Sequence, residues 1–160
     1  MSPLPERKPV SASRTELAEL MMPGDANILG KVFGGRVLAL IDKAAATAAM
    51  RHAGGVCVTA QIDRVTFAQP IEIGNMARFV AEVTYVGRSS LEVRVEVFAM
   101  NLNSGEERAT NTCYVTLVAV DEEGRPRPVP RLECETADER ARYEEGRQRM
   151  EERRRRRKGG

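Results

Sequence analysis

Tryptophan is absent from this chain, aromatic residues make up 4% of it, and a single histidine, His52, occurs among its 160 residues. A Ser-His-Asp triad would therefore have to use His52. The three cysteines, Cys57, Cys113 and Cys134, form no CxxC pair. With one histidine and no cysteine pair, a zinc site is not expected, and we predict no bound metal. The cysteines are predicted to be buried or free thiols in a reducing cytoplasm.

Several other classes of protein are also disfavoured. The chain has no GxxxxGK[ST] phosphate loop and no GxGxxG after a strand. Its N-terminal residues, MSPLPERKPV, contain no long apolar run, so neither a signal peptide nor a membrane span is expected. The whole chain has 25 basic and 23 acidic residues, and residues 1–132 carry 15 of each. A neutral body has no bulk attraction to nucleic acid or to an anionic membrane.

The periodicity predicts one α+β domain. Residues 1–12 are rich in proline, serine and charge and are expected to be mobile. Residues 15–22 fit either a strand or a helical turn. An alanine-rich helix is predicted over 36–52, ending at Gly54 and Gly55. After it the period changes from 3.6 to 2, which predicts strands over 56–67 (with a β-bulge where the apolar phase slips), 77–85, 91–99 and 112–119. We expect an antiparallel sheet that curves around the central helix, within a domain spanning 13–132.

The last segment, 133–160, differs from the body in composition. Residues 136–158 form a charged helix candidate, with Thr136 or Asp138 as its N-cap. Its end, Arg153–Lys158, is a run of six cations. Such a run is typical of a solvated, frayed tail, and loose contact with RNA or a membrane surface is the alternative.

Asp42 stands out on the predicted helix. On a helical wheel it shares a row with Leu38, Ala45 and Ala49, so a carboxylate projects from an otherwise apolar face. Burying an unpaired charge is expensive, so the residue either finds a backbone or arginine partner or has a functional role.

Gly34 and Gly35 precede this helix, about two turns before Asp42. Free N–H groups and the positive end of the helix dipole at this point can bind an anion or a developing oxyanion. A carbonyl held there would have its carbon within reach of a carboxylate such as Asp42, in the same subunit or a neighbouring one. This combination suits acyl transfer to water.

Several blocks of the sequence, taken in order, resemble the hotdog-fold acyl-CoA thioesterases of the cytosolic acyl-CoA hydrolase family. The blocks are DANILGKVFGGRVLALID at 25–42, VTFAQP at 65–70, VGRSS at 86–90 and DEEGRPRPVP at 121–130. The resemblance covers residues 17–132, and 135–149 is similar to the C-terminal helix of the animal enzymes. It implies a hotdog fold, in which a curved antiparallel sheet wraps one long helix.

The resemblance also implies an active site between subunits. Asn27 matches the catalytic asparagine and Asp42 the catalytic aspartate, one from each subunit. The thioester carbonyl would face Gly34 and Gly35, and Asp42 would act as general base or as nucleophile. The assembly implied is a dimer, with three dimers forming a homohexamer.

The same resemblance points to residues for the coenzyme A nucleotide. Because backbone N–H groups and a guanidinium suit phosphate, we expect Gly87, Arg88, Ser89 and Ser90 to bind it, although an ordinary hairpin turn remains the alternative. Arg64 and Arg131 are weaker candidates. No cofactor is expected, since coenzyme A is part of the substrate.

Two other functions fit the sequence less well. A hotdog hydratase or dehydratase would pair a histidine with an acid on the helix, and no such pair occurs here. A non-catalytic acyl-CoA-binding regulator, which could contact nucleic acid through the arginine tail, would be expected to carry a DNA-binding domain before residue 15. Nucleic acid is therefore not a predicted partner, and thioester hydrolysis is the predicted function.

Overall fold

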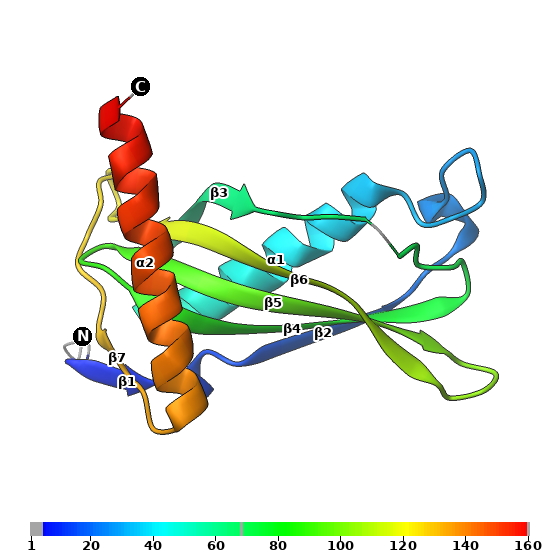
Figure 1. Ribbon diagram of the computed structural model, residues 1–160, viewed down its shortest axis with the longest axis horizontal. Helices are drawn as coiled ribbons and strands as arrows, with labels where there is room; N and C mark the ends of the chain where they lie inside the picture. The colour runs from blue at the N-terminus through cyan, green and yellow to red at the C-terminus, as the bar shows by residue number, and fades with distance from the viewer. Residues whose placement is uncertain (1–4, 68, 160) are drawn as a thin grey trace.

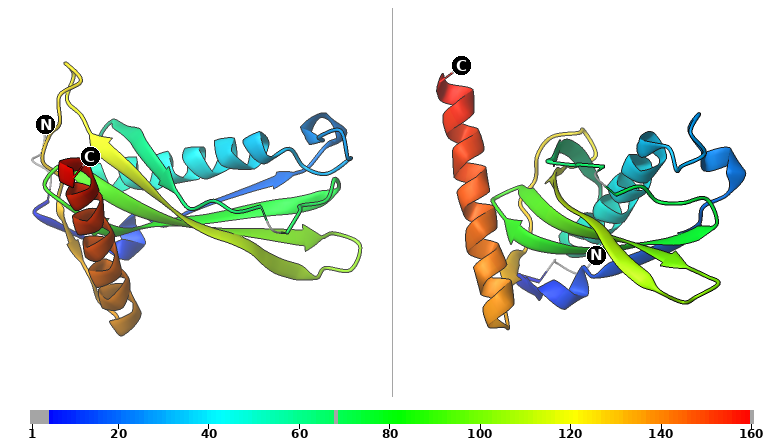
Figure 2. Two further views of the ribbon diagram at one scale, coloured as in Figure 1. Left: turned by 45° about the horizontal axis from the view of Figure 1, so that its top comes forward. Right: turned by 45° about the vertical axis from the view of Figure 1, so that its right-hand side comes forward.

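A five-stranded antiparallel sheet and one long helix form the body of the computed structural model, which describes residues 5–67 and 69–159. The strand order is β2-β4-β5-β6-β3. The strands of this sheet are β2 (Thr15–Leu20), β3 (Cys57–Asp63), β4 (Asn75–Val86), β5 (Ser90–Asn101) and β6 (Glu107–Ala119). The helix α1 (Gly34–Ala53) lies along one face of this sheet (Figures 1 and 2). This confirms the expected hotdog arrangement and shows that residues 15–20 are a strand.

Small side chains let α1 approach the sheet closely. Ala44, Ala45, Ala48 and Ala49 are completely buried against it. The helix ends where Gly54 adopts a left-handed conformation (φ +74°) and donates its N–H to the Met50 carbonyl, as a glycine C-cap does. The predicted helix, 36–52, is therefore correct to within two residues at each end.

The three long strands follow the predicted alternation, and the inward side chains of β5 (Leu91, Val93, Val95 and Val97) are fully buried. Strand β3 differs from the prediction. Its bulge lies between Thr59 and Gln61, and the strand ends at Asp63 instead of continuing to 67. Val58 is 49% exposed, because β3 is an edge strand with a free side and only Cys57 of its first three residues faces the core.

The N-terminal residues expected to be mobile are partly ordered, which corrects the prediction for 7–12; residues 1–4 lie outside the described part. Strand β1 (Arg7–Pro9) pairs in parallel with β7 (Arg131–Glu133), and a short 3-10 helix (Val10–Ala12) follows it. Val10 in this turn is buried in the core. The pairing partner lies more than 120 residues away, so the local composition gave no sign of it.

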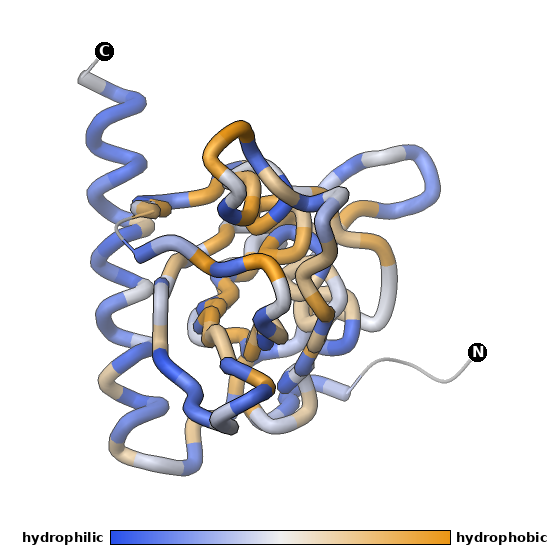
Figure 3. Tube along the Cα trace, turned by 90° about the vertical axis from the view of Figure 1, so that its right-hand side faces the viewer, coloured by the Kyte–Doolittle hydropathy of each residue, from blue (hydrophilic) through white to orange (hydrophobic). Residues whose placement is uncertain are grey.

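The second helix, α2 (Ala137–Gly159), packs on the face of the sheet opposite α1, and Thr136 caps its N-terminus by accepting the N–H of Glu139. Figure 3 shows that α2 is hydrophilic along most of its length. Polar contacts dock it. The carboxylate of Glu92 on β5, completely buried beneath α2, accepts hydrogen bonds from Arg149 Nε (2.9 Å) and Nη2 (2.8 Å).

Two expectations about this region are therefore wrong. The alternation of Glu92, Arg94 and Glu96 with apolar residues over 91–99 predicts that one face of this strand is solvated, but α2 covers that face at Glu92. The run Arg153–Lys158 was predicted to be a frayed tail, but it is helical, and the Arg153 side chain is 12% exposed and donates to Thr116 Oγ1. Only residues 154–158 of that run are fully exposed. Within the described residues no helix is long and apolar enough to cross a bilayer.

Candidate active site

A largely apolar cavity of about 510 Å³ opens at the N-terminal end of α1. Asn27, from the loop before the helix, and Gly34, its first residue, both line it. The remaining lining residues are Leu29, Lys31, Val32, Val37, Phe67, Gln69, Pro70, Ile71 and Asn111. A few polar side chains thus lie on the wall of a mostly apolar cavity, which is the usual form of a binding site for an amphipathic small molecule.

The orientation of Asn27 is fixed by its own loop. Its Oδ1 accepts the backbone N–H groups of Leu29 (2.9 Å) and Lys31 (3.1 Å). The asparagine therefore caps its own turn, as the structural alternative requires. With the oxygen engaged, the Nδ2 amide remains as a donor, and it has no acceptor among the described residues.

The start of α1 offers further donors. Its N-cap residue, Phe33, makes no capping hydrogen bond through its side chain. The Phe33 carbonyl accepts the N–H groups of Arg36 and Val37, whereas those of Gly34 and Gly35 have no acceptor in the described part of the chain. A Cβ on Gly34 would lie 3.5 Å from the Phe67 ring, and one on Gly35 would lie 2.9 Å from Phe33. Position 34 thus has room for a small side chain, whereas a side chain at position 35 would crowd the Phe33 ring.

Asp42 lies two turns into α1 and is half-buried. Its Oδ1 accepts a 2.6 Å hydrogen bond from Thr59 Oγ1, on the edge strand β3. The sequence interpretation missed Thr59, because a threonine in a strand gives no signal of a partner 17 residues earlier. The partner that Asp42 finds is thus a hydroxyl rather than an arginine or the backbone.

One chain does not bring all the candidate catalytic residues together. Asn27 and Gly34 line the apolar cavity, whereas Asp42 is not among its lining residues. The side chains around both places are unusually exposed for apolar residues: Ile28, Leu29 and Phe33 in the loop, and Val56 and Val58 at the start of β3. Large exposed apolar surfaces of this kind mark interaction sites.

His52 cannot serve as a base beside Asp42 in the same chain. It is completely buried near the far end of α1, and its Nε2 lies 2.8 Å from the Pro130 carbonyl oxygen. Among the described residues, no cluster of three or more His, Cys, Asp or Glu side chains could hold a metal ion.

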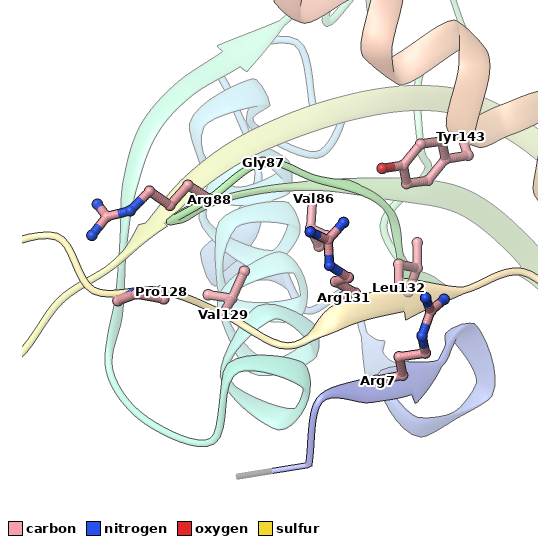
Figure 4. Close-up of a pocket in the computed structure, with 9 residues that line it drawn as sticks. All are labelled: Arg7, Val86, Gly87, Arg88, Pro128, Val129, Arg131, Leu132 and Tyr143. Atoms are coloured by element: carbon pink, nitrogen blue, oxygen red, sulfur yellow. The ribbon is translucent and has the colours of Figure 1, made fainter.

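A second cavity, of about 570 Å³, lies at this far end of the sheet. It brings together Gly87, Arg88 and Arg131, three of the residues predicted to bind a nucleotide (Figure 4). The structure adds Arg7 and Tyr143, which the sequence interpretation missed because they lie in segments predicted to be a mobile terminus and a charged helix. Burial raises the pKa of the Tyr143 phenol, so it stays an O–H donor at neutral pH.

The other predicted nucleotide-binding residues do not line this cavity. Ser89 and Ser90 complete the β4–β5 turn, where the Ser90 carbonyl accepts the Gly87 N–H (2.9 Å). Arg64, which has a positive φ of 53°, lines a separate cavity with Arg149 and Arg153 on the α2 side of the sheet.

Comparisons with known proteins agree with this geometry. Residues 29–104 match the model of the thioesterase superfamily. Protein VdlD of Helicobacter pylori is 40% identical over 136 residues, which are 84% of this chain and 78% of that protein. The cytosolic acyl coenzyme A thioester hydrolase of Mus musculus is 35% identical over 144 residues, which are 89% of this chain but 38% of that longer protein.

Two solved structures are similar along most of their length. An apo-hexameric acyl-CoA thioesterase has a TM-score of 0.90 and 44% identity, covering 94% of this chain and 97% of its own. The acyl-CoA hydrolase of Staphylococcus aureus, solved with butyryl coenzyme A, coenzyme A and coenzyme A disulfide, has a TM-score of 0.86 and 38% identity, with 94% and 92% covered. Variants of the latter with an aspartate, an asparagine or a threonine changed to alanine are also similar.

Proposed function

Because the chain belongs to the hotdog-fold acyl-CoA thioester hydrolases of the cytosolic type, we propose that it hydrolyses acyl-CoA in a site that two subunits complete. The products are a free fatty acid and coenzyme A, and the proposed location is the cytoplasm. The observation that carries the proposal is the apolar cavity whose polar end holds the free Nδ2 donor of Asn27 beside the N-terminus of α1.

In this proposal the acyl chain occupies the apolar cavity and its carbonyl oxygen faces Asn27 and Gly34, with the Gly35 N–H nearby. These amides are oriented before the substrate arrives, so they can stabilise the negative charge that develops on the oxygen. The positive end of the α1 dipole acts in the same direction.

Asp42 of a second subunit would supply the reacting carboxylate. As a general base it takes a proton from water, the water oxygen bonds to the carbonyl carbon, and the C–S bond breaks to give thiol and acid. As a nucleophile its oxygen bonds to the carbonyl carbon and the C–S bond breaks, which releases the coenzyme A thiolate and leaves a mixed anhydride; water then hydrolyses the anhydride, releasing the fatty acid and restoring the carboxylate. Thr59 holds the carboxylate in either route.

Edge strand β3 is the surface through which two subunits would join. Its free side would pair with β3 of a second copy, which extends the sheet and covers Val56 and Val58. This pairing would bring Asp42 and Thr59 of one copy toward the Asn27 loop of the other. Hexameric relatives support a trimer of such dimers.

The nucleotide of the substrate would occupy the second cavity, beside Gly87, Arg88 and Arg131. Guanidinium groups bind phosphate through paired hydrogen bonds. In one chain this cavity and the apolar cavity lie at opposite ends of α1, a helix about 30 Å long at 1.5 Å per residue. A substrate that uses both kinds of cavity would therefore bridge two subunits.

The test is thiol release from acyl-CoAs of short to long chain by the wild type and by Asp42→Asn. We expect the variant to lose about 100-fold or more of kcat while it stays folded and keeps its oligomeric state. Asp138→Asn, an exposed carboxylate in the first turn of α2, is the matched control and should keep full activity. Wild-type binding without thiol release would instead favour a non-catalytic acyl-CoA-binding regulator.

A further inference from the structure

Three arginines line the second cavity, and no carboxylate lines it with them. Arg7 comes from β1, Arg88 from the β4–β5 turn and Arg131 from β7. None of the nine lining residues is acidic. Within the part of the chain that the structure describes, none of the three guanidinium groups forms a salt bridge.

Arg7 and Arg131 are direct neighbours. They are register partners in the parallel β1–β7 pair, whose strands lie about 4.8 Å apart. Like charges placed opposite each other on a sheet destabilise the pairing, so this arrangement has a cost that an anion between the two would remove. Tyr143 of α2 points its hydroxyl toward the same side of the cavity as Arg131 (Figure 4).

Arg88 lies at the other end of the cavity, and its guanidinium points away from the other two (Figure 4). The segment between β6 and β7, residues 120–130, is called the strap. Its path shows the order in which the three arginines lie, starting from the β3 edge of the sheet. The strap contacts β6 first, where Arg127 donates its N–H to the Ala119 carbonyl. It then passes the turn, where Val129 donates to the Arg88 carbonyl, and ends as β7 beside Arg7.

This order assigns the two ends of the cavity to two different phosphate groups. Coenzyme A carries a diphosphate next to its pantetheine arm and a separate monophosphate on the 3′ position of the ribose, farther from the thioester. Because β6 pairs with the edge strand β3, at which we place the reaction, Arg88 lies nearer to the thioester than the Arg7–Arg131 pair does.

We propose that Arg7 and Arg131 together bind the 3′-phosphate of coenzyme A, with the Tyr143 hydroxyl beside them, so that β1 is a substrate-recognition element. The inference rests on the proposed function. It predicts that the enzyme selects thioesters of coenzyme A over those of 3′-dephospho-coenzyme A and of phosphopantetheine, which lack this group. A planar guanidinium pair suits a phosphate dianion, since each can donate two hydrogen bonds.

The test compares acyl-CoA with the same acyl ester of 3′-dephospho-coenzyme A, for the wild type and Arg7→Gln. We expect the wild type to favour acyl-CoA by about tenfold or more in kcat/KM, mainly through KM. Arg7→Gln should lose most of this preference by weakening acyl-CoA while barely changing the dephospho ester. Arg154→Gln, an exposed arginine at the far end of α2, is the matched control and should keep the preference.

Equal losses on both esters would mean that Arg7 only supports the fold, and unchanged kinetics would mean that it does not touch the substrate; either result overturns the inference. Arg7→Gln should fold, because the pairing of β1 uses backbone groups such as the Arg131 N–H and the Glu6 carbonyl. Binding of free coenzyme A and of 3′-dephospho-coenzyme A, measured by calorimetry, separates this inference from the proposed hydrolysis. An Arg7-dependent preference in binding would support it even if no thiol were released.

Discussion

The Nε2 of His52, near the end of α1, lies 2.8 Å from the carbonyl oxygen of Pro130, 78 residues later in the chain. Arg127 supports the same connection, since its Nη2 donates to the Ala53 carbonyl (3.1 Å) and its Nε to the Val120 carbonyl (3.2 Å). These contacts fix the strap that leads into β7. The end of the central helix therefore positions Arg131, one residue beyond Pro130, in the second cavity.

The burial of His52 predicts a pH dependence of stability. Burial lowers the pKa of His52 below its ordinary 6.5, the hydrogen bond to Pro130 opposes this in part, and Lys8 adds to the lowering. The unfolded state therefore binds a proton before the folded state does. The stabilisation is complete above about pH 6.5 and is lost as the pH falls toward the lower folded-state pKa.

Urea unfolding of the wild type and of His52→Gln, at about pH 7.5 and about pH 5.5, measures this effect. Glutamine keeps a donor for Pro130 but does not titrate. The free energy of unfolding of the wild type should fall more steeply with decreasing pH than that of the variant. The carboxylates titrate in both proteins, so subtracting one pH dependence from the other cancels their contribution. Parallel pH dependences would contradict the prediction.

Thr59 is predicted to position Asp42 for reaction. Thr59→Ala removes the 2.6 Å hydrogen bond and should lower kcat by about tenfold to 100-fold, because the Asp42 carboxylate loses its orientation. KM should change little, because the binding site of the substrate is unaltered. Thr59→Ser keeps the hydroxyl and should restore most of kcat. If serine and alanine variants were equally slow, the hydroxyl would not be the cause.

Arg149 is predicted to be essential for docking α2. Arg149→Ala removes two hydrogen bonds to the buried Glu92 carboxylate and leaves Arg153 Nη2, 4.0 Å away, as its cationic neighbour, which should cost about 3 kcal/mol in the free energy of unfolding. Adding Glu92→Gln should recover part of this loss, since the side chain at position 92 then carries no charge to bury. Arg155→Ala, whose side chain is 79% exposed beside Glu151, should cost less than about 1 kcal/mol. Chemical denaturation of the wild type and of these three variants, including the double one, tests the prediction.

The sequence was informative wherever neighbouring residues determine the structure. The alanine-rich run and its terminal glycine predicted α1 closely, and strict alternation predicted β4, β5 and the C-terminal half of β6. The polar character of Glu92, Arg94 and Glu96 was read as a solvated face. That interpretation was wrong at Glu92, because α2 brings Arg149, 57 residues later in the chain, to the carboxylate.

The candidate site likewise contains residues that the sequence identified and residues that only the folded structure identifies. The resemblance named Asn27, Gly34 and Asp42, whose roles stay predictions; the structure places Asn27 and Gly34 at the apolar cavity and Asp42 beside Thr59. Thr59, Arg7 and Tyr143 have no local signal, since their importance comes from strand pairing and helix packing across the chain. The bulge in β3 was expected from the change of apolar phase, but its position at 59–61 depends on the register with β6.

The β1–β7 pair has a consequence for synthesis of the protein. A ribosome adds about 5–20 residues per second, from the N-terminus onward. Arg7 is made early, but its strand partner Arg131 and the packing helix residue Tyr143 follow only when most of the described chain has emerged. The nascent chain can therefore assemble α1 and its sheet before the cavity that we propose for the nucleotide is complete, so the proposed recognition of the substrate would be among the last features to form.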